Sequence, residues 1–243
     1  SYRLRLMASS LATRLRDHLP TDRFGHALRC ADEVDSTNER AAAWAADGAP
    51  DGAVVCADHQ TDGRGRHGRT WTDTKGQNLL FSVVLRPQMP SGRLGLLPVA
   101  ASVAVAETVD AFVSPHRAAL KWPNDVLLGG RKACGMLLES SLATPQRSTV
   151  VVLGVGLNVN QTDFPDALAD TATSLRLVLG RPVPRAPLLA RLLAALEHRS
   201  DAVQQGRAAT VRRAYEERLV SLHKPTTLHV PSAGRSLSGT VQG

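Results

Sequence analysis

The ten residues DGRGRHGRTW, at positions 62–71, combine three arginines, three glycines and a histidine and end on a tryptophan. Arg64, Arg66 and Arg69 supply fixed positive charge, and the glycines between them let the backbone approach a bound group closely. This composition predicts a loop that holds an anion. Two other interpretations compete with it, a solvent-exposed basic loop and an RNA-binding arginine–glycine segment. Aromatic residues make up only 4% of the chain, which leaves little for bases to stack on.

The same loop contains the pattern G-x-G-x-x-G at Gly63, Gly65 and Gly68, which is the fingerprint of dinucleotide-binding proteins. That fingerprint needs a helix that begins inside the motif, because the phosphates bind at the helix N-terminus. Residues 69–78, RTWTDTKGQN, have turn composition and no apolar helical stripe. We therefore reject a dinucleotide site. A phosphate-binding loop of the type G-x-x-x-x-G-K-[ST] is absent from the sequence as well.

A second polar group lies around KWPNDVLL, residues 121–128. Lys121, Asn124, Asp125 and Lys132 place two cations, an amide and a carboxylate around one predicted hairpin. Such a set could hold the phosphates of a nucleotide together with a divalent ion. An ordinary polar turn with a Pro-Asn-Asp corner explains the segment better when it is taken alone.

Taken in order, five segments between residues 33 and 160 resemble the biotin protein ligases, also called holocarboxylase synthetases: EVDSTNERA, ADHQTDGRGRHGRTW, KWPNDVLL, RKACGMLLE and LGVGLNVN. The resemblance implies an α+β fold with a mixed β-sheet packed on helices, a class II synthetase-like catalytic domain over residues 1–221. Residues 222–243 would begin a small SH3-like β unit that is incomplete. The residues before the first expected strand are too few for a winged helix-turn-helix, so the chain resembles the monofunctional type without a DNA-binding domain.

The resemblance also implies an activity: an ATP-dependent ligase that activates biotin to biotinyl-5′-AMP and transfers it to a lysine of a biotin carboxyl carrier domain. ATP with Mg²⁺ and biotin would be substrates, with no tightly bound cofactor. The partner would be the carrier domain of acetyl-CoA carboxylase or a related enzyme, with no nucleic acid and no membrane, and the protein a monomer or weak homodimer. Two alternatives remain, a lipoate or octanoate ligase or transferase on the related fold and a basic nucleic-acid-binding protein without catalysis.

Site residues follow from the same resemblance. Biotin would be bound by Ser36, Thr37, Gln60, Gly63, Arg64, Gly65, Arg66, Lys132, Gly135 and Gly154. The nucleotide would be bound by Arg66, Arg69, Trp71, Asn124, Asp125, Lys132 and Asn158. Lys132, which bridges biotin's carboxylate and the α-phosphate, and Arg66 would be catalytic, and Asp125 is a candidate ligand of a Mg²⁺ ion held mainly by ATP.

The polar trio Ser36, Thr37 and Gln60 favours biotin over lipoate, because a ureido ring needs hydrogen-bond partners and a dithiolane ring has none to satisfy. Ser36 has a competing role, since its spacing from Glu39 predicts a helix-capping box. Cys134 stands where the family usually has alanine and Met136 where a branched aliphatic residue is common, so the pocket volume is expected to differ slightly.

These residues need elements to position them. Expected strands are residues 27–34, 53–57, 78–87 and 149–160, with further strands in 119–140 joined by turns at 123–125 and 129–130. The strand at 149–160 is apolar on both faces, which predicts a place at the centre of the sheet. Expected helices are residues 36–48, 94–112, 187–205 and 208–219, with a weak helical pattern before Pro20.

Composition limits the size of the domain, the charge of its partners, its localisation and the state of its cysteines. With 243 residues, 43% of them hydrophobic, the chain is long enough for one large globular domain. A net charge of +7 suits an anionic partner, although an arginine-rich composition alone produces a similar value. The sequence shows no apolar run of about 18 residues and no secretory signal, which predicts a cytoplasmic protein. Its three cysteines have no metal-binding spacing, and we expect reduced thiols in the core.

Overall fold

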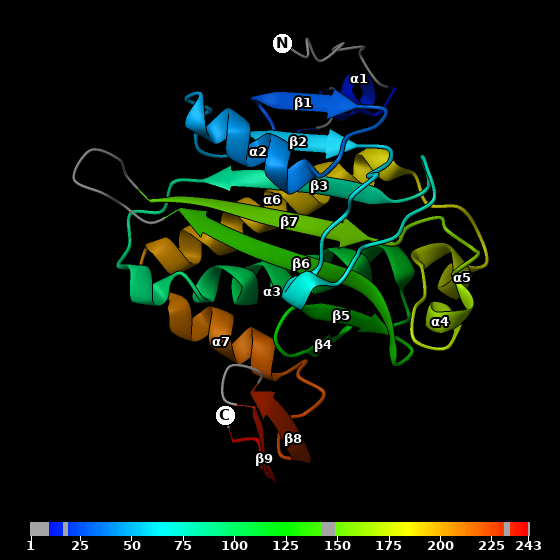
Figure 1. Ribbon diagram of the computed structural model, residues 1–243, viewed down its shortest axis with the longest axis vertical. Helices are drawn as coiled ribbons and strands as arrows, with labels where there is room; N and C mark the ends of the chain where they lie inside the picture. Colours follow the sequence, from blue (N-terminus) through cyan, green and yellow to red (C-terminus); the bar gives the residue numbers. More distant parts are fainter. Residues whose placement is uncertain (1–9, 17–18, 142–148, 231–233, 243) are drawn as a thin grey trace.

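The computed structural model describes residues 10–16, 19–141, 149–230 and 234–242. A seven-stranded sheet in the order β1-β2-β3-β7-β6-β5-β4 forms its centre, with helices on both faces (Figure 1). Strands β1 and β2 are parallel, and the other neighbouring pairs of this sheet are antiparallel. The expected mixed sheet packed on helices is confirmed, and so is the central position of the strand expected at 149–160, which is β7.

The strands are β1 (Leu28–Ala31), β2 (Val54–Ala57), β3 (Leu79–Leu85), β4 (Ala119–Lys121), β5 (Asp125–Leu128), β6 (Arg131–Ser141), β7 (Val150–Leu157), β8 (Pro225–Val230) and β9 (Arg235–Thr240). The helices are α1 (Ser10–Arg16), α2 (Thr37–Ala46), α3 (Leu96–Val113), α4 (Asp166–Ala169), α5 (Leu175–Leu179), α6 (Arg185–Gln204) and α7 (Ala208–Glu216), with short 3₁₀ turns at Arg66–Gly68 and Ser91–Arg93. The sequence did not predict α4 and α5, because helices of four and five residues are too short to show a periodic apolar stripe.

One face of the sheet carries the main hydrophobic core. Alternate residues of β3, Leu79, Phe81 and Val83, lie in this core together with side chains of α3 and α6. Figure 1 shows α6 behind the sheet. Within the described part of the chain, one segment, Ser91–Val113, is long and apolar enough to cross a membrane, but most of it is buried inside this fold. The apolar composition of α3 is therefore explained by its place in the core.

The opposite face is covered only in part. Helix α2 packs there through Ala41 and Ala45 against Val84 of β3 and Val152 of β7, and Figure 1 shows α2 in front of the sheet. The cluster contains small side chains, which lets α2 lie close to the strands. Further along β3 and β7, α2 no longer covers the sheet. A cavity lies against this uncovered part of the sheet face.

The turn between β5 and β6 matches the expected hairpin. Gly129 and Gly130 have φ angles of 56° and 80°, the left-handed region that a two-residue hairpin turn requires at both positions. Of the helical pattern expected before Pro20, only α1 and residues 19–20 lie in the described residues.

Two local expectations were wrong. Ser36 occupies the N-cap position of α2 but its side chain makes no capping hydrogen bond, and Glu39 forms an ion pair with Arg64 instead of closing a capping box. Cys30 and Cys56 form a disulfide in place of two reduced thiols. The register of β1 and β2 sets these two cysteines directly opposite each other, with Cα atoms 4.6 Å apart. Sequence spacing alone could not show that pairing.

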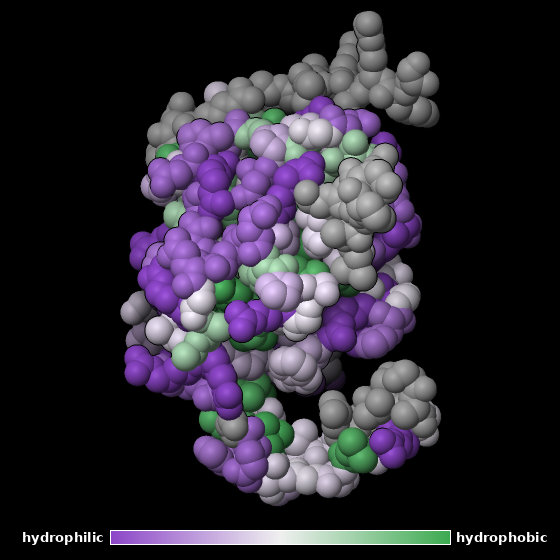
Figure 2. Space-filling view, turned by 90° about the vertical axis from the view of Figure 1, so that its left-hand side faces the viewer, coloured by the Kyte–Doolittle hydropathy of each residue, from purple (hydrophilic) through white to green (hydrophobic). Residues whose placement is uncertain are grey.

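Strands β8 and β9 form a separate two-stranded sheet that extends from the body near α7 (Figure 1). Figure 2 shows a mostly hydrophilic face above it and several hydrophobic residues around this hairpin. Leu237 of β9 has about half of its surface exposed. The change to short strands was expected after residue 222, and the domain boundary at 221/222 stays a prediction.

Candidate functional site

A cavity of about 790 Å³ opens on the sheet face that α2 leaves uncovered. It is lined by every residue proposed above for biotin or the nucleotide except Gly63: Ser36, Thr37, Gln60, Arg64, Gly65, Arg66, Arg69, Trp71, Asn124, Asp125, Lys132, Gly135, Gly154 and Asn158. These residues come from five separate segments, so the fold brings together what the sequence keeps apart.

Two glycines form part of the cavity floor. Gly135 of β6 and Gly156 of β7 are paired directly across the two strands, and the indole ring of Trp71 lies against both. A Cβ atom on Gly156 would lie 2.6 Å from Cε2 of this ring, so no larger residue fits without moving it. Gly156 was not among the predicted site residues, although its Gly-x-Gly spacing from Gly154 predicts that both face the same side of a strand.

A β-bulge places the lysine of the site. The register of β5 and β6 passes from Val126–Cys134 to Leu127–Lys132 and skips Ala133. Lys132 and Gly135 are three residues apart, which in a regular strand would put them on opposite faces. With one extra residue the Lys132 side chain returns to the cavity, where a Cβ on Gly135 would lie 2.9 Å from its Nζ.

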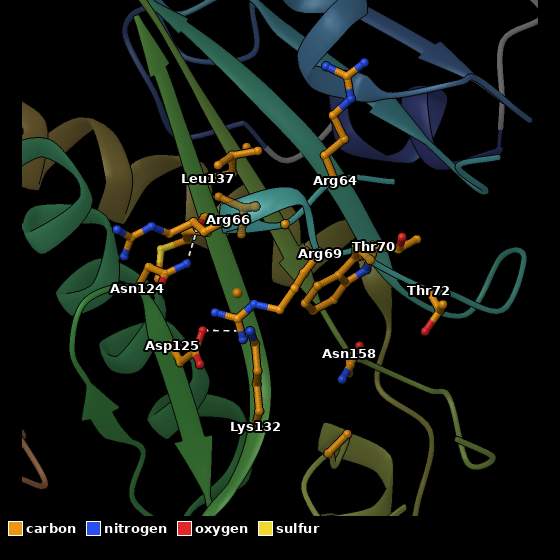
Figure 3. A pocket seen from close by; sticks show the side chains of 18 of the residues that line it. Arg64, Arg66, Arg69, Thr70, Thr72, Asn124, Asp125, Lys132, Leu137 and Asn158 are labelled. Atoms are coloured by element: carbon orange, nitrogen blue, oxygen red, sulfur yellow. Dashed lines mark hydrogen bonds and ion pairs between the residues drawn. The ribbon is translucent and has the colours of Figure 1, made fainter. Parts of the chain in front are cut away.

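Lys132 forms an ion pair with Asp125, with 2.7 Å between Nζ and Oδ1 (Figure 3). Their side chains are about 34% and 22% exposed, so the pair is partly shielded from water. The backbone of Lys132 is held too, since its N–H donates to the carbonyl of Thr171 and its carbonyl accepts from Thr173. A cation fixed in this way can contact two anionic groups at once, with Asp125 as the counter-charge.

The turn before Asp125 is tied to the sheet by Asn124. Its Nδ2 donates to the carbonyl of Met136 at 2.5 Å, and the N–H of Met136 donates to the carbonyl of Asn124 at 3.1 Å. Trp122 packs edge-on against Tyr215 of α7, with ring centroids 6.5 Å apart. Burial, with the nearby Asp125 carboxylate as the second cause, raises the pKa of Tyr215 to about 12, so this ring is neutral at physiological pH.

The arginine-rich segment forms a narrow hairpin over the cavity. The N–H of Trp71 donates to the carbonyl of Gly63 at 2.8 Å, and the N–H of Gly65 to that of Arg69 at 2.6 Å. A Cβ on Gly63 would lie 2.5 Å from the Trp71 carbonyl oxygen, which explains the glycine. Only a three-residue 3₁₀ turn occurs in this segment. No α-helix begins in the glycine motif, in agreement with the turn composition of residues 69–78.

The three arginines of the hairpin lie in different directions (Figure 3). Arg69 extends to the Lys132–Asp125 pair and Arg66 extends toward Asn124. Arg64 points away from both and forms its ion pair with Glu39 of α2 at the rim. Its expected contact with biotin stays a prediction.

The part of the cavity beside the N-terminus of α2, lined by Ser36, Thr37 and Gln60, is polar and uncharged. Gln60 Oε1 accepts hydrogen bonds from the backbone N–H of Thr37 at 2.7 Å and from its hydroxyl at 3.0 Å. This arrangement leaves the Gln60 amide nitrogen to donate elsewhere. Ser36 is buried in the cavity wall, and its hydroxyl does not cap α2. Three adjacent side chains therefore offer both donors and acceptors.

The segment after β7 completes the wall. It contributes Phe164, Leu168, Asp170 and Ala172, none of which was among the predicted site residues. Asn158 anchors this segment, because its Nδ2 donates to the carbonyl of Thr173 at 3.0 Å. The sequence signal for these wall residues is weak, because residues 161–172 show no helical or strand periodicity. They become part of the site only through the fold.

The pocket volume was expected to differ through Met136 and Cys134, and this expectation was wrong for Cys134. Its side chain is buried in the main hydrophobic core, on the opposite face of β6 from Gly135, while Met136 does reach the cavity wall. Burial raises the pKa of the Cys134 thiol well above its ordinary value, which keeps it unreactive. Among the described residues no cluster of three or more metal-binding side chains occurs. Asp125 and Asp170 are the carboxylates that line the cavity.

A model of the biotin/lipoate A/B protein ligase family matches residues 31–158, just over half of the chain. The chain belongs to this family. The matched residues include the last residue of β1, all of β2 to β7 and all the predicted site residues. The family model covers ligases for both biotin and lipoate, so family membership by itself leaves the acyl group open.

Individual relatives are named as ligases, one of them as a ligase for biotin. The chain is 45% identical over 172 residues to the biotin–[acetyl-CoA-carboxylase] ligase of Mycobacterium tuberculosis, covering 69% of this chain and 61% of that protein. It is 38% identical over 187 residues to the bifunctional ligase/repressor BirA of Bacillus spizizenii, covering 76% of this chain and 57% of the relative. The chain thus spans about three fifths of the length of these proteins.

A solved structure agrees with this comparison. The structure is similar to biotin protein ligase from Aquifex aeolicus in complex with biotin and ATP, with a TM-score of 0.78 and 29% identity, covering 88% of this chain and 86% of that one. The similarity includes nearly the whole chain.

Proposed function

We propose that this chain is an ATP-dependent ligase that joins biotin to a lysine of a biotin carboxyl carrier domain. The names of its relatives and the biotin and ATP in the similar Aquifex structure support the proposal. The observation that carries it is the layout of one cavity. The Thr37–Gln60 pair and the Lys132–Asp125 ion pair line the same cavity, with a glycine floor between them.

Spacing along β7 fits a ligand with a polar head and a short chain that ends in a carboxylate. Asn38, next to Thr37, lies against Gly154, whereas Trp71 and the Lys132 side chain lie by the pair Gly135–Gly156. Two residues along a strand correspond to roughly 7 Å. Biotin bound with its ureido ring near Thr37 would extend its carboxylate toward Lys132.

Two chemical steps follow in this proposal. The carboxylate oxygen of biotin attacks the α-phosphorus of ATP, forming an acyl–phosphate bond and releasing pyrophosphate. The amine of the carrier lysine then attacks the acyl carbon, loses a proton and releases AMP. Both steps move negative charge onto phosphate oxygens, so cations already in place lower the barrier. Lys132 stands between the carboxylate and the α-phosphate, and Arg69 and Arg66 face the phosphates.

The hairpin 62–71 has a second role, to exclude water. A mixed anhydride hydrolyses if water reaches it, and a glycine-containing loop above the cavity can shield it and still open for the carrier. Trp71 at the base of this hairpin offers an aromatic surface that suits the adenine ring or the biotin chain. Phe164 and Leu168 add apolar surface on the other wall.

Magnesium enters the proposal as part of the ATP substrate. Asp125 and Asp170 supply carboxylate oxygens, which are ligands that Mg²⁺ prefers, and the triphosphate would supply the others. The proposed partner is the carrier domain of acetyl-CoA carboxylase or a related enzyme, and the protein is a cytoplasmic monomer or weak homodimer with no nucleic-acid or membrane partner.

An ATP–pyrophosphate exchange assay with biotin, lipoate or octanoate as the acid tests the proposal. We expect exchange with biotin alone, followed by transfer of biotin to a purified carrier domain. Exchange with lipoate or octanoate in place of biotin would assign the chain to the other branch of its family. No exchange with any of the three acids would contradict the ligase assignment.

A further inference from the structure

One hydroxyl lies in an otherwise apolar strand beside the cavity. Strand β3 has the sequence LLFSVVL, and its Ser82 is fully buried between Leu80 and Val84 on the α2 side of the sheet. Its Oγ lies 2.8 Å from Thr37 Oγ1 and 2.6 Å from Asn38 Oδ1. A buried hydroxyl costs free energy unless it is hydrogen-bonded, and here it contacts two polar side chains that line the cavity.

Asn38 is held from two sides. Its Nδ2 donates to Glu139 Oε2 at 2.7 Å, while its Oδ1 faces Ser82. Gly154 pairs with Ser82 across β3 and β7, and a Cβ on this glycine would collide with the Asn38 amide. The amide therefore fills the space that the glycine leaves, and it connects the exposed Glu139 of β6 to the buried Ser82.

The chemistry of these groups fixes the direction of the hydrogen bonds. The Glu139 carboxylate accepts, so the Asn38 amide must turn its nitrogen to it and its oxygen to Ser82. Since Asn38 Oδ1 only accepts, Ser82 donates its one proton there. The Thr37 hydroxyl then has two acceptors within reach, Ser82 Oγ and Gln60 Oε1.

In either arrangement the Thr37 proton is used inside the protein. The remaining lone pair of Thr37 Oγ1 is thus an acceptor for a ligand in the cavity. A ligand head with an N–H group satisfies it, whereas a sulfur or hydrocarbon head leaves it without a partner at a cost in free energy.

We propose that Ser82 and Glu139 are positioning residues that orient Asn38 and Thr37, so that Thr37 accepts a hydrogen bond from a ureido N–H of the ligand. This inference rests on the proposed biotin ligase function and adds the origin of its selectivity. Neither residue touches the ligand: Ser82 acts through Thr37 and Asn38, and Glu139 acts through Asn38.

The first test is Ser82→Ala, with Ser102→Ala as the matched control. Ser102 is equally buried, but its hydroxyl donates to the carbonyl of Pro98 within α3, in the main core. We expect Ser82→Ala to raise the KM for biotin about five- to tenfold, with kcat and the KM for ATP within about twofold of wild type, because one buried hydrogen bond that supports binding is lost. Ser102→Ala should leave all three unchanged.

The second test is Glu139→Gln, which keeps the shape but lets the Asn38 amide turn around. Glu139 is exposed, so this variant tests the proposal even if Ser82→Ala lowers the melting temperature. We expect the KM for biotin to rise about threefold. Glu217→Gln, which removes an exposed charge from a loose surface pair, is its control and should have no effect.

Desthiobiotin identifies the part of the ligand that is affected. It keeps the ureido ring of biotin and lacks the sulfur-containing ring, so in Ser82→Ala its KM should rise in parallel with that of biotin. A rise for biotin alone, or an unchanged KM in both folded variants, would overturn the inference. If the wild-type protein catalyses no biotin-dependent exchange, the proposed function fails before the variants are compared, so the two failures are distinguishable.

Discussion

Replacing Gly156 by alanine should damage the site without damaging the fold. A Cβ at this position would lie 2.6 Å from Cε2 and 2.8 Å from Cζ2 of Trp71, whereas carbon atoms in contact lie about 3.5–4.0 Å apart. The rigid indole must therefore retreat by roughly 1 Å. Misplacement by this amount costs up to about a hundredfold in rate, which corresponds to about 2.7 kcal/mol. We expect kcat/KM for biotin-dependent exchange to fall by this order.

Gly239→Ala is the matched control. Gly239 also lies within a strand, β9, and a Cβ there meets no other atom within 4 Å. Both variants should melt within a few degrees of the wild type, because neither glycine has a left-handed backbone that alanine would strain. If Gly156→Ala keeps kcat/KM within threefold of Gly239→Ala and of the wild type, the position of Trp71 against the cavity floor does not matter for the reaction, and the reasoning is refuted.

Four further predictions follow from the same geometry. Lys132→Ala should abolish pyrophosphate exchange and weaken biotin binding only modestly, since the lysine cation matters most as charge develops on the phosphate. The exchange assay measures the first effect and isothermal titration with biotin the second, and unchanged exchange would contradict a catalytic role for Lys132. Arg66→Gly should release biotinyl-5′-AMP roughly ten- to a hundredfold faster, because the lost charge-assisted contact is worth ~1.5–3 kcal/mol. Released biotinyl-5′-AMP acylates lysines of any protein, so blotting for biotin on albumin incubated with the variant detects it. Biotin label confined to the carrier domain would assign the loop another role. Arg64→Ala should change the melting temperature of the ligand-free protein by less than about 3 °C, because exposed ion pairs contribute about 0–1 kcal/mol; a loss of many degrees would make this arginine structural. Thiol titration of the unfolded, unreduced protein should find one reactive cysteine, and three would show that Cys30 and Cys56 are not joined.

Much of the architecture could be predicted from the sequence because the patterns are long. The nearly continuous apolar run of α3 and the two-sided apolar strand β7 each fit one kind of environment, and both were found where expected. The Gly129-Gly130 turn is equally local, since a two-residue hairpin needs left-handed φ angles that glycine adopts without strain. Short elements such as α4 carry too few residues for a pattern to show.

The residues of the site were predicted by motif, but their roles depend on contacts across the sheet. The capping box of Ser36 and Glu39 failed because Arg64, 25 residues further along, takes the Glu39 carboxylate. The wall residues of segment 161–172 were missed because their only signal is their position after β7. Side-chain partners far apart in the sequence cannot be inferred from local spacing.

The sequence by itself determined the chemistry available to this protein: fixed cations on a glycine-rich loop, a lysine and a carboxylate around one hairpin, and polar side chains at the start of a helix. The tertiary structure decided how they face each other. The bulge at Ala133 turns Lys132 to the same side as Gly135, and the β1–β2 register sets Cys30 against Cys56. In a strand, a shift of one residue moves every side chain to the other face, and that register is set by pairing between distant segments.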